Sequence, residues 1–556
     1  MNYLNESKTL LSFIEKVCEK YPQKDALIYL GEKFSFSNLL DLIKRFSFSL
    51  HDLGIKPNDK ILIYLGNSPQ FIISFLGIQA IGAIPVPVSP IYTPFELGNI
   101  ITDCQIDTII CQDTNFRYIM EIYKKNDLKR IIVSNIADLL PFWKRWIGRA
   151  IDKIPKGRII KTNKVYFFKE LIRKYQIYPC SCELNITQNI ASILYTGGTT
   201  RSPKRISSSH AKILSTVRDF RILTDNIIPE GGKDIILVAI PLFHMMGLEV
   251  IFGWGLGKGI TTILLPFPNV DAILDTIQSY KVSIFVGVPT LYRMILANER
   301  LDSYNLDSLK FCWSGGDILS HDIFNRWNEK FHLPIYQIYG TTETGCITLS
   351  PLDQFPEPGS IGLPIPSKKI KIIDPNTLEE LSYNQVGVLM ATSENLIEGY
   401  SNNRKDIFES YIEKEGYLWH LTEDYVRMDN RGILFYIDRS ADMIKYKGYR
   451  ISCSEIEMVL QSHPAVKEAC VIGISNPDVG ELIKAIVILK GGTKGVSSAE
   501  LIKWCREKLA PYKIPDYIEF RDSLPKSKIG KLLRQEIRDE EQRRWGKKRQ
   551  FNFNKN

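Results

Sequence analysis

Short apolar runs of strand length alternate with helix-length segments through most of this 556-residue chain. Residues 60–65, 84–88 and 284–288 are predicted strands, 37–53 carries apolar residues at helical spacing, and 70–81 is a predicted amphipathic helix. Alternation of this kind predicts an α/β fold, in which largely parallel sheets are flanked by helices. Because one hydrophobic core cannot serve a chain of this length, two or more domains are expected.

The pattern changes twice toward the C-terminus. Turn residues cluster between strands over 360–438, which predicts a smaller β-rich subdomain within an N-terminal domain spanning 1–438. Residues 439–540 read as a hairpin, two helices and further strands, so they predict a small α+β domain. Residues 541–556 are polar and basic, and we expect a loose tail.

Composition restricts the setting of the chain. No apolar run approaches the roughly 20 residues needed to span a bilayer, and the N-terminus has no signal-peptide pattern. The 10 cysteines are scattered, as in a cytoplasmic protein with free thiols. Residues 117–174 hold sixteen Lys or Arg and five Asp or Glu, whereas the whole chain has a net charge of +9. Positive charge is therefore local, which argues against a nucleic-acid partner.

Residues 141–155 interrupt the alternation with a predicted amphipathic helix. Trp143 and Trp146 fall on its apolar face, and Lys144 and Arg149 fall on the opposite face. This composition is typical of a helix lying in a membrane interface, here at the anionic inner face of the membrane. A helix packed on the protein body with a solvated basic face fits the pattern equally well.

A loop of small, hydroxylic and basic residues follows the apolar run 193–195 directly. Small residues let backbone N–H groups surround an anion, and Arg201 and Lys204 add positive charge. The loop is suited to a polyphosphate, although a polar surface turn is the alternative. It is not a P-loop, because no glycine precedes Lys204 and no Ser or Thr follows it.

This loop resembles the phosphate loop of the adenylate-forming superfamily, and six further motifs follow in that family's order. They are PLFHMMGL (241–248), SGGDILS (314–320), YGTTET (339–344), WHLTEDYVRMD (419–429), DRSADMIKYKGYRISCSEIE (438–457) and PKSKIGKLLR (525–534). The chain is most similar to medium- and long-chain fatty acyl-CoA ligases. The resemblance implies ATP-dependent formation of an acyl-adenylate with release of pyrophosphate, followed by thioester formation with coenzyme A.

The resemblance also implies which residues bind each substrate. Those implied for ATP and AMP are Thr196, Gly197, Gly198, Thr199, Thr200, Lys204, Gly315, Gly316, Tyr339, Gly340, Thr341, Asp424 and Arg439. The implied catalytic residues are Lys531, Glu343, Thr342 and His244, with Glu343 as the Mg²⁺ ligand, and coenzyme A is expected near Lys447, Gly448 and Tyr449. Without that context, Asp424, Arg439 and Lys531 would be interpreted as solvated surface charges.

The stretch after His244 bears on the acid that is activated. In amino-acid-activating relatives a nearby Asp pairs with the substrate amine, whereas here no carboxylate occurs before Glu249. Apolar lining favours a fatty or aryl acid, with His244 bordering the acyl channel. An isolated His beside two methionines would otherwise be interpreted as a packed core residue.

Three residues depart from the family pattern. Arg201 and Arg205 replace glycines of the phosphate loop, and Ala441 replaces the polar hinge residue. If position 201 needs a left-handed backbone, Arg201 is strained there, and contact of the extra charge with phosphate would partly offset the strain. The three departures support one of the two alternatives that stay open, the degraded homologue. One is an acyl-AMP ligase that loads a carrier-protein pantetheine, and the other is a degraded homologue that binds nucleotide or acyl groups with little turnover.

Overall fold

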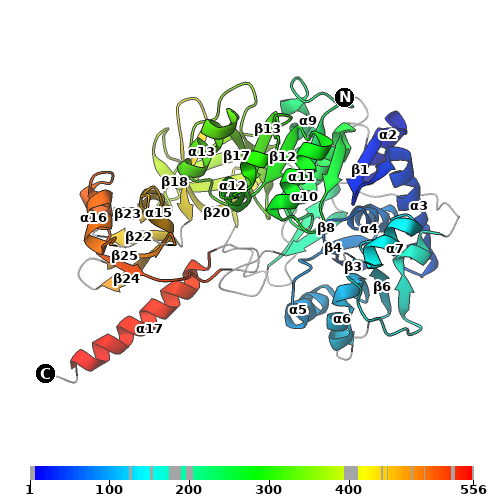
Figure 1. Cartoon of the computed structure of the whole chain (residues 1–556), viewed down its shortest axis with the longest axis horizontal. Coiled ribbons are helices and arrows are strands. Elements are labelled where there is room, and N and C mark those ends of the chain that lie inside the picture. Colours follow the sequence, from blue (N-terminus) through cyan, green and yellow to red (C-terminus); the bar gives the residue numbers. More distant parts are fainter. Residues whose placement is uncertain are drawn as a thin grey trace.

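The computed structural model describes residues 7–123, 128–150, 154–173, 189–195, 204–393, 411–439, 442–446, 449–476, 480–491, 493, 495–526 and 532–553. Figure 1 shows an elongated arrangement in which the sheets and helices of the larger part are followed by a small C-terminal unit at one end. The predicted α/β fold, with a large sheet-containing part and a small α+β part, is confirmed.

The first sheet is entirely parallel, with strand order β4-β3-β5-β6-β7. Its strands are β3 (Lys60–Tyr64), β4 (Ile84–Pro87), β5 (Thr108–Gln112), β6 (Arg130–Ser134) and β7 (Val165–Phe167). The helices before, between and after them are α2 (Leu10–Lys20), α3 (Phe36–Asp52), α4 (Pro69–Ala80), α5 (Pro94–Cys104), α6 (Phe116–Tyr123), α7 (Phe142–Ala150) and α8 (Phe168–Leu171). A two-stranded antiparallel hairpin of β8 (Ile190–Tyr195) and β9 (Arg205–Ser209) follows.

A second sheet of 14 strands contains the middle of the chain. Its parallel part has the order β14-β13-β12-β10-β11-β1, and β2 is antiparallel at the edge. These strands are β1 (Asp25–Tyr29), β2 (Glu32–Ser35), β10 (Ile235–Val238), β11 (Thr261–Leu264), β12 (Ile284–Gly287), β13 (Phe311–Gly315) and β14 (Ile335–Thr341). The accompanying helices are α9 (His210–Thr224), α10 (Met245–Val250), α11 (Val270–Tyr280), α12 (Pro289–Leu296) and α13 (His321–Phe331).

The same sheet continues into an antiparallel region beyond β14. Its order is β15-β16-β21-β20-β18-β17, and β19 pairs with β20. The strands are β15 (Gly345–Leu349), β16 (Ser360–Pro364), β17 (Lys368–Ile373), β18 (Val386–Ser393), β19 (Tyr411–Lys414), β20 (Tyr417–Met428) and β21 (Leu434–Arg439). The β-rich segment is thus hydrogen-bonded to the parallel strands through β15 and β16.

The C-terminal unit contains a sheet of five strands in the order β23-β22-β25-β24, with β26 on β25. Its elements are β22 (Met443–Tyr446), β23 (Tyr449–Ser452), α15 (Cys453–Gln461), β24 (Val466–Asn476), β25 (Gly480–Leu489), α16 (Ser498–Arg506), β26 (Tyr517–Phe520) and α17 (Arg534–Phe553). Asp438 at the end of β21 accepts hydrogen bonds from the Ser452 hydroxyl and the Ser454 amide, which join the two sheets locally.

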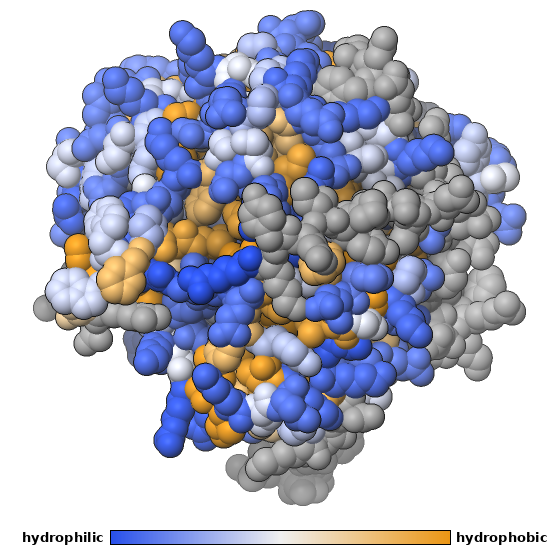
Figure 2. Space-filling view, turned by 90° about the vertical axis from the view of Figure 1, so that its right-hand side faces the viewer, coloured by the Kyte–Doolittle hydropathy of each residue, from blue (hydrophilic) through white to orange (hydrophobic). Residues whose placement is uncertain are grey.

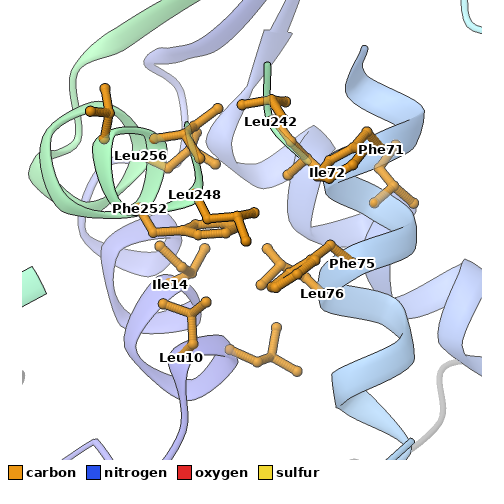
Figure 3. Close-up of a cluster of buried hydrophobic side chains, with 14 of the residues drawn as sticks. Leu10, Ile14, Phe71, Ile72, Phe75, Leu76, Leu242, Leu248, Phe252 and Leu256 are labelled. Carbon is orange, nitrogen blue, oxygen red and sulfur yellow. The ribbon is translucent and has the colours of Figure 1, made fainter. Parts of the chain in front are cut away.

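Helix α4 differs from the prediction for residues 70–81, because it is not amphipathic. Every residue from Pro69 to Ala80 is buried. Figure 3 shows why: Phe75 and Leu76 of α4 face Leu10 and Ile14 of α2 on one side, beside Phe252. The Phe75 and Phe252 ring centroids lie 5.6 Å apart. A helix surrounded by other elements has no solvated face to display polar residues.

The expected loose tail also differs from the structure. Residues 541–553 continue helix α17, and the Glu541 carboxylate is buried against Lys484 and Arg521 at 2.6 and 2.7 Å. The start of the segment is held by these ion pairs, whose partners lie on β25 and just after β26.

Two further findings concern composition. The described cysteines, Cys18, Cys104, Cys111, Cys312, Cys346, Cys453, Cys470 and Cys505, are free and buried. Among the residues that the structure describes, no helix is long and apolar enough to cross a bilayer.

Candidate nucleotide and acyl site

The predicted phosphate loop is the connection of the β8–β9 hairpin. Thr196, Gly197, Gly198, Thr199, Thr200 and Arg201 lie outside the described residues, and Lys204 directly precedes β9. Strand β9 was not predicted from the sequence. The Arg205 guanidinium at its start binds Asp103 of α5, donating to the backbone carbonyl at 3.3 Å and lying 3.7 Å from the carboxylate.

The YGTTET motif forms the tight turn between β14 and β15. The hydroxyls of Thr341 and Thr344 lie 2.8 Å apart, and the Thr344 amide donates to the Thr341 hydroxyl at 3.2 Å. Between them, the Glu343 carboxylate has one oxygen 3.8 Å from Nε2 of His420 on β20, and its side chain remains partly exposed. The fold thus presents Glu343 on a turn that its own threonines stabilise.

Three buried charged side chains are hydrogen-bonded to the backbone of this turn and of the start of β15. Nζ of Lys212 donates to the carbonyl of Glu343 at 2.6 Å, and Nζ of Lys368 donates to the carbonyl of Thr344 at 2.7 Å. The Glu249 carboxylate accepts from the Cys346 amide at 3.0 Å. Burial lowers the pKa of Lys212 to about 7, with the Lys368 charge adding to the effect, and burial raises the pKa of Glu249.

Asp424 lies at the edge of this region and is buried. Its carboxylate accepts from the Tyr339 hydroxyl at 2.6 Å and from the Tyr436 hydroxyl at 3.2 Å, and it lies 3.5 Å from Nε of Arg439. Burial and the adjacent carboxylate raise the pKa of Tyr339, so its hydroxyl remains a donor. The interpretation of Asp424 as a solvated surface charge is therefore wrong, whereas the Arg439 side chain is exposed.

The three predicted site glycines that the structure describes fall where a side chain could not fit or where the backbone is left-handed. A Cβ on Gly315 would lie 2.5 Å from the Ile338 carbonyl and 2.9 Å from the Met246 methyl group. A Cβ on Gly340 would lie 2.3 Å from the Gly345 carbonyl, and Gly316 has φ +80°. The SGG and HMMG motifs are therefore in close contact at the end of β13.

His244 precedes helix α10, and its ring lies 4.4 Å from that of Phe243. The side chain is exposed, so the interpretation as a packed core histidine is wrong. Met245 behind it is buried.

Lys531, Ala441, Lys447 and Gly448 lie outside the described residues, and Tyr449 begins β23.

The donor set around Glu343 can be compared with the needs of Mg²⁺. Among the described residues there is no group of three His, Cys, Asp or Glu side chains that could hold a metal. A single partly exposed carboxylate fits a magnesium ion whose other ligands come from nucleotide phosphates and water.

Sequence reasoning missed Lys212, Lys368 and His420, and it considered Glu249 only for its position after His244. Lys212 contacts a residue 131 positions away, and Lys368 contacts one 24 positions away. No periodicity or spacing links residues so far apart. The only local sign is that Lys212 and Glu249 interrupt otherwise apolar or small surroundings.

Comparison with known families identifies the class of protein. Residues 14–401 match the AMP-binding enzyme family, and residues 455–531 match the AMP-binding enzyme C-terminal domain. The chain belongs to this adenylate-forming family of AMP-binding enzymes, so the predicted resemblance is confirmed.

Curated relatives and solved structures narrow the similarity. The chain is 30% identical over 540 residues to a long-chain-fatty-acid–CoA ligase of Bacillus subtilis, covering 96% of this chain and 95% of the relative. A ligase of the same name from Escherichia coli is 29% identical, with coverage of 96% and 94%. The anthranilate CoA ligase AuaEII in complex with anthranoyl-AMP superposes with a TM-score of 0.82 at 25% identity, covering 96% of each chain. ATP-bound MatB from Rhodopseudomonas palustris has the same fold, with a TM-score of 0.82 at 22% identity and coverage of 96% and 99%.

Proposed function

We propose that the chain activates a medium- or long-chain fatty acid with ATP and transfers the acyl group to coenzyme A. The main observation in support is that Tyr339 on β14 is hydrogen-bonded to the buried Asp424, while Glu343 lies on the turn between β14 and β15. A site for a nucleoside triphosphate needs both an acceptor for the sugar hydroxyls and a carboxylate that binds the metal on the phosphates. The relatives named long-chain-fatty-acid–CoA ligase support the choice of acid.

In the first step the acid and ATP are both anions, so the chain must supply cations and geometry. Residues 196–200 and Lys204 hold the β- and γ-phosphates, and Thr342 lies beside the α-phosphate. Asp424 accepts from the ribose hydroxyls, Arg439 contacts the same sugar, and Tyr339 stacks on adenine. Glu343 would hold Mg²⁺, which would supply positive charge next to the phosphates, and Lys531 holds the incoming carboxylate.

The acyl group lies beside the contact between Gly315 and Met246, with His244 at its border. Glu249, the first carboxylate after His244, is committed to the Cys346 amide and is surrounded by the charges of Lys212 and Lys368. It is therefore not available to pair with a substrate amine. This supports a fatty or aryl acid over an amino acid.

The second step uses a different arrangement of the C-terminal unit. On this proposal the boundary falls after residue 438, the unit pivots at Ala441, and the pantetheine passes Lys447, Gly448 and Tyr449. In chain order, β21 is the last strand that joins the large sheet and β22 is the first that joins the C-terminal sheet, which supports this division.

The proposal is tested by measuring pyrophosphate release with a panel of carboxylic acids, with and without coenzyme A. We expect turnover with fatty acids of medium or long chain and thioester formation with coenzyme A. Thioester formation only with a carrier protein would replace the acceptor in the proposal. A lack of pyrophosphate release with every acid would contradict the proposal and favour a degraded homologue.

We also propose that α7 contacts an anionic membrane surface. Its Phe142, Trp143 and Trp146 side chains are 76%, 58% and 66% exposed. Lys144 turns back to Glu32, 2.5 Å away, so this lysine anchors the helix to the protein body. Figure 2 views the side of the molecule bearing α2, α3 and α7 in Figure 1, where hydrophobic surface is interspersed among hydrophilic side chains.

The residues after α7 supply charge of the matching sign. Lys156, Arg158 and Lys161 are exposed, and each basic residue near an anionic surface contributes about 1 kcal/mol. Exposed aromatic side chains beside basic ones are the composition of interfacial segments.

Vesicle sedimentation measures this contact. The double variant Trp143→Ala/Trp146→Ala should lose most of its binding to anionic vesicles, and wild-type binding should fall as salt rises. Phe355→Ala, which removes an exposed aromatic side chain from a different part of the surface, is the matched control. Equal sedimentation of the double variant and wild type would instead favour a helix that is simply packed on the body.

A further inference from the structure

Three buried charged side chains next to the Glu343 turn have no role in the proposed chemistry, yet each is hydrogen-bonded to the backbone of residues 343–346. Lys212 binds the Glu343 carbonyl, Lys368 binds the Thr344 carbonyl, and Glu249 binds the Cys346 amide. Lys212 and Lys368 are 2% and 5% exposed, and Glu249 is 4% exposed. Burying three charges costs free energy unless each is hydrogen-bonded, and here each is.

These three side chains come from separate elements that surround the turn. Lys212 belongs to the first turn of α9, Glu249 to α10 and Lys368 to the first residue of β17. Asp219, two turns further along α9, accepts from the Ser367 amide at 2.8 Å and so fixes the residue before Lys368. Helix α9 therefore reaches the turn both directly and through the start of β17.

Helix α9 is joined to the phosphate loop by the single strand β9. Strand β9 runs from Arg205 to Ser209, and Ser209 caps α9 by accepting from the Lys212 amide at 3.1 Å. Lys212 thus links the backbone of Glu343 to residues 204–209, which we call the phosphate arm. This contact is the direct one between the two segments, and the Asp219–Ser367 and Lys368–Thr344 hydrogen bonds add an indirect one.

We propose that Lys212, together with Lys368 and Glu249, is a positioning residue that fixes the Glu343 turn relative to the phosphate arm. The inference rests on the proposed function of Glu343 and Lys204 in binding metal and phosphate. Removing Lys212 leaves both parts of the site present but loosens their relative placement. The loss should appear in how much Mg²⁺ raises the affinity for ATP, because the metal would bind Glu343 and the phosphates held by Lys204 at the same time.

The test compares Lys212→Met with Lys258→Met in the full chain. Lys258 is a matched control because it is fully buried and bound to Asp225 at 2.8 Å and to the Ile228 carbonyl at 2.7 Å, without contacting the turn. Calorimetry measures ATP affinity with excess Mg²⁺ and with the metal chelated. The metal-dependent gain is the ratio of ATP affinity with Mg²⁺ to ATP affinity without it. We expect this ratio to fall about tenfold in Lys212→Met, while the metal-free affinity changes by less than about threefold.

Kinetics give the second readout. The KM for MgATP in pyrophosphate release should rise about tenfold in Lys212→Met, with a smaller change in kcat, and should stay near wild type in Lys258→Met. A metal-dependent gain that is the same in both variants and wild type would overturn the inference. If Lys212→Met does not fold, Lys368→Met carries the same comparison through the Thr344 carbonyl. Wild-type protein that shows the metal-dependent gain but releases no pyrophosphate would contradict the proposed function alone.

Discussion

Arg205 departs from the family pattern, and its side chain is bound to a neighbouring helix at the base of the phosphate loop. The family pattern predicts glycine at this position, and the Arg205 guanidinium lies 3.7 Å from the Asp103 carboxylate and donates to the Asp103 carbonyl at 3.3 Å. Asp103 also accepts from the Tyr195 hydroxyl at 2.5 Å. One carboxylate therefore joins the last residue of β8 and the first residue of β9, at the base of the phosphate loop.

Asp103→Ala should raise the KM for ATP about three- to tenfold with little change in kcat, because the loop loses its anchored base but keeps its phosphate contacts. Steady-state pyrophosphate release measures both constants. Asp107→Asn is the control, since Asp107 pairs with Lys129 at 2.9 Å and does not touch the hairpin. If Arg205→Ala instead reduces kcat several hundredfold, Arg205 contacts phosphate in the working enzyme.

At the scale of elements, helix α9 combines packing with support of the site. Its first residue, His210, is buried, and Nδ1 accepts from the Leu10 amide of α2 at 3.5 Å. Burial lowers the pKa of His210 to about 4 from an ordinary value of 6.5. The unfolded chain therefore binds a proton at this residue more readily than the folded chain does between these two values.

This difference predicts a pH dependence of stability. The contribution of neutral His210 is fully present above pH 6.5 and is lost as pH falls toward 4. At pH 5 the loss is about 2 kcal/mol. His210→Gln, which has no titrating group, should lose less stability than wild type between pH 7 and pH 5 in thermal unfolding. His51→Gln, at an exposed site on α3, should follow wild type, and parallel pH profiles for all three proteins would rule out this role of His210.

Elements were predictable where local sequence alone determines them. The strands beginning at Lys60, Ile84 and Ile284 match their predicted starts because a buried parallel strand is a short apolar run. Strand β9 was missed because RISSS has only one apolar residue, although its hydroxyls are buried by packing and pairing with β8. Helix α4 was predicted as a helix but not as a fully buried one, because burial on its second face depends on α2 and residues near Phe252.

The site was predictable only where motifs carry it. Tyr339, Glu343 and Asp424 were implied by the resemblance of their motifs to the family, and the structure brings the first and last together at 2.6 Å. Lys212 and Lys368 have no motif, because their partners are backbone carbonyls, which any residue supplies. Such contacts are determined by tertiary packing and leave no residue-type signature in the sequence.

At the scale of the whole molecule, the roles proposed for the two sheets require the C-terminal unit to approach the large one. Lys531→Ala should reduce pyrophosphate release from acid and ATP on the order of 10²–10³-fold, because it removes a cation from the point where two anions meet. Thioester formation from a synthetic acyl-adenylate and coenzyme A should stay near the wild-type rate. Single-turnover assays of each half-reaction measure this separation.

Lys526 supplies the control for that variant. It lies near Lys531 in the chain but is paired with Glu468 at 2.6 Å, so Lys526→Ala should leave the first half-reaction largely intact. Equal loss of both half-reactions in Lys531→Ala would make the lysine structural or shared between the steps. An unchanged first half-reaction would remove Lys531 from the catalytic residues.

The burial of the described thiols has a practical consequence for chemical labelling. Burial raises the pKa of Cys18 and Cys470 to about 12 and that of Cys505 to about 11, so the reactive thiolate is scarce at neutral pH. Cys18 reports on the large N-terminal core and Cys505 on the C-terminal one. Alkylation of these thiols requires their cores to open, and mass spectrometry of the modified peptides would show which core opens first on heating.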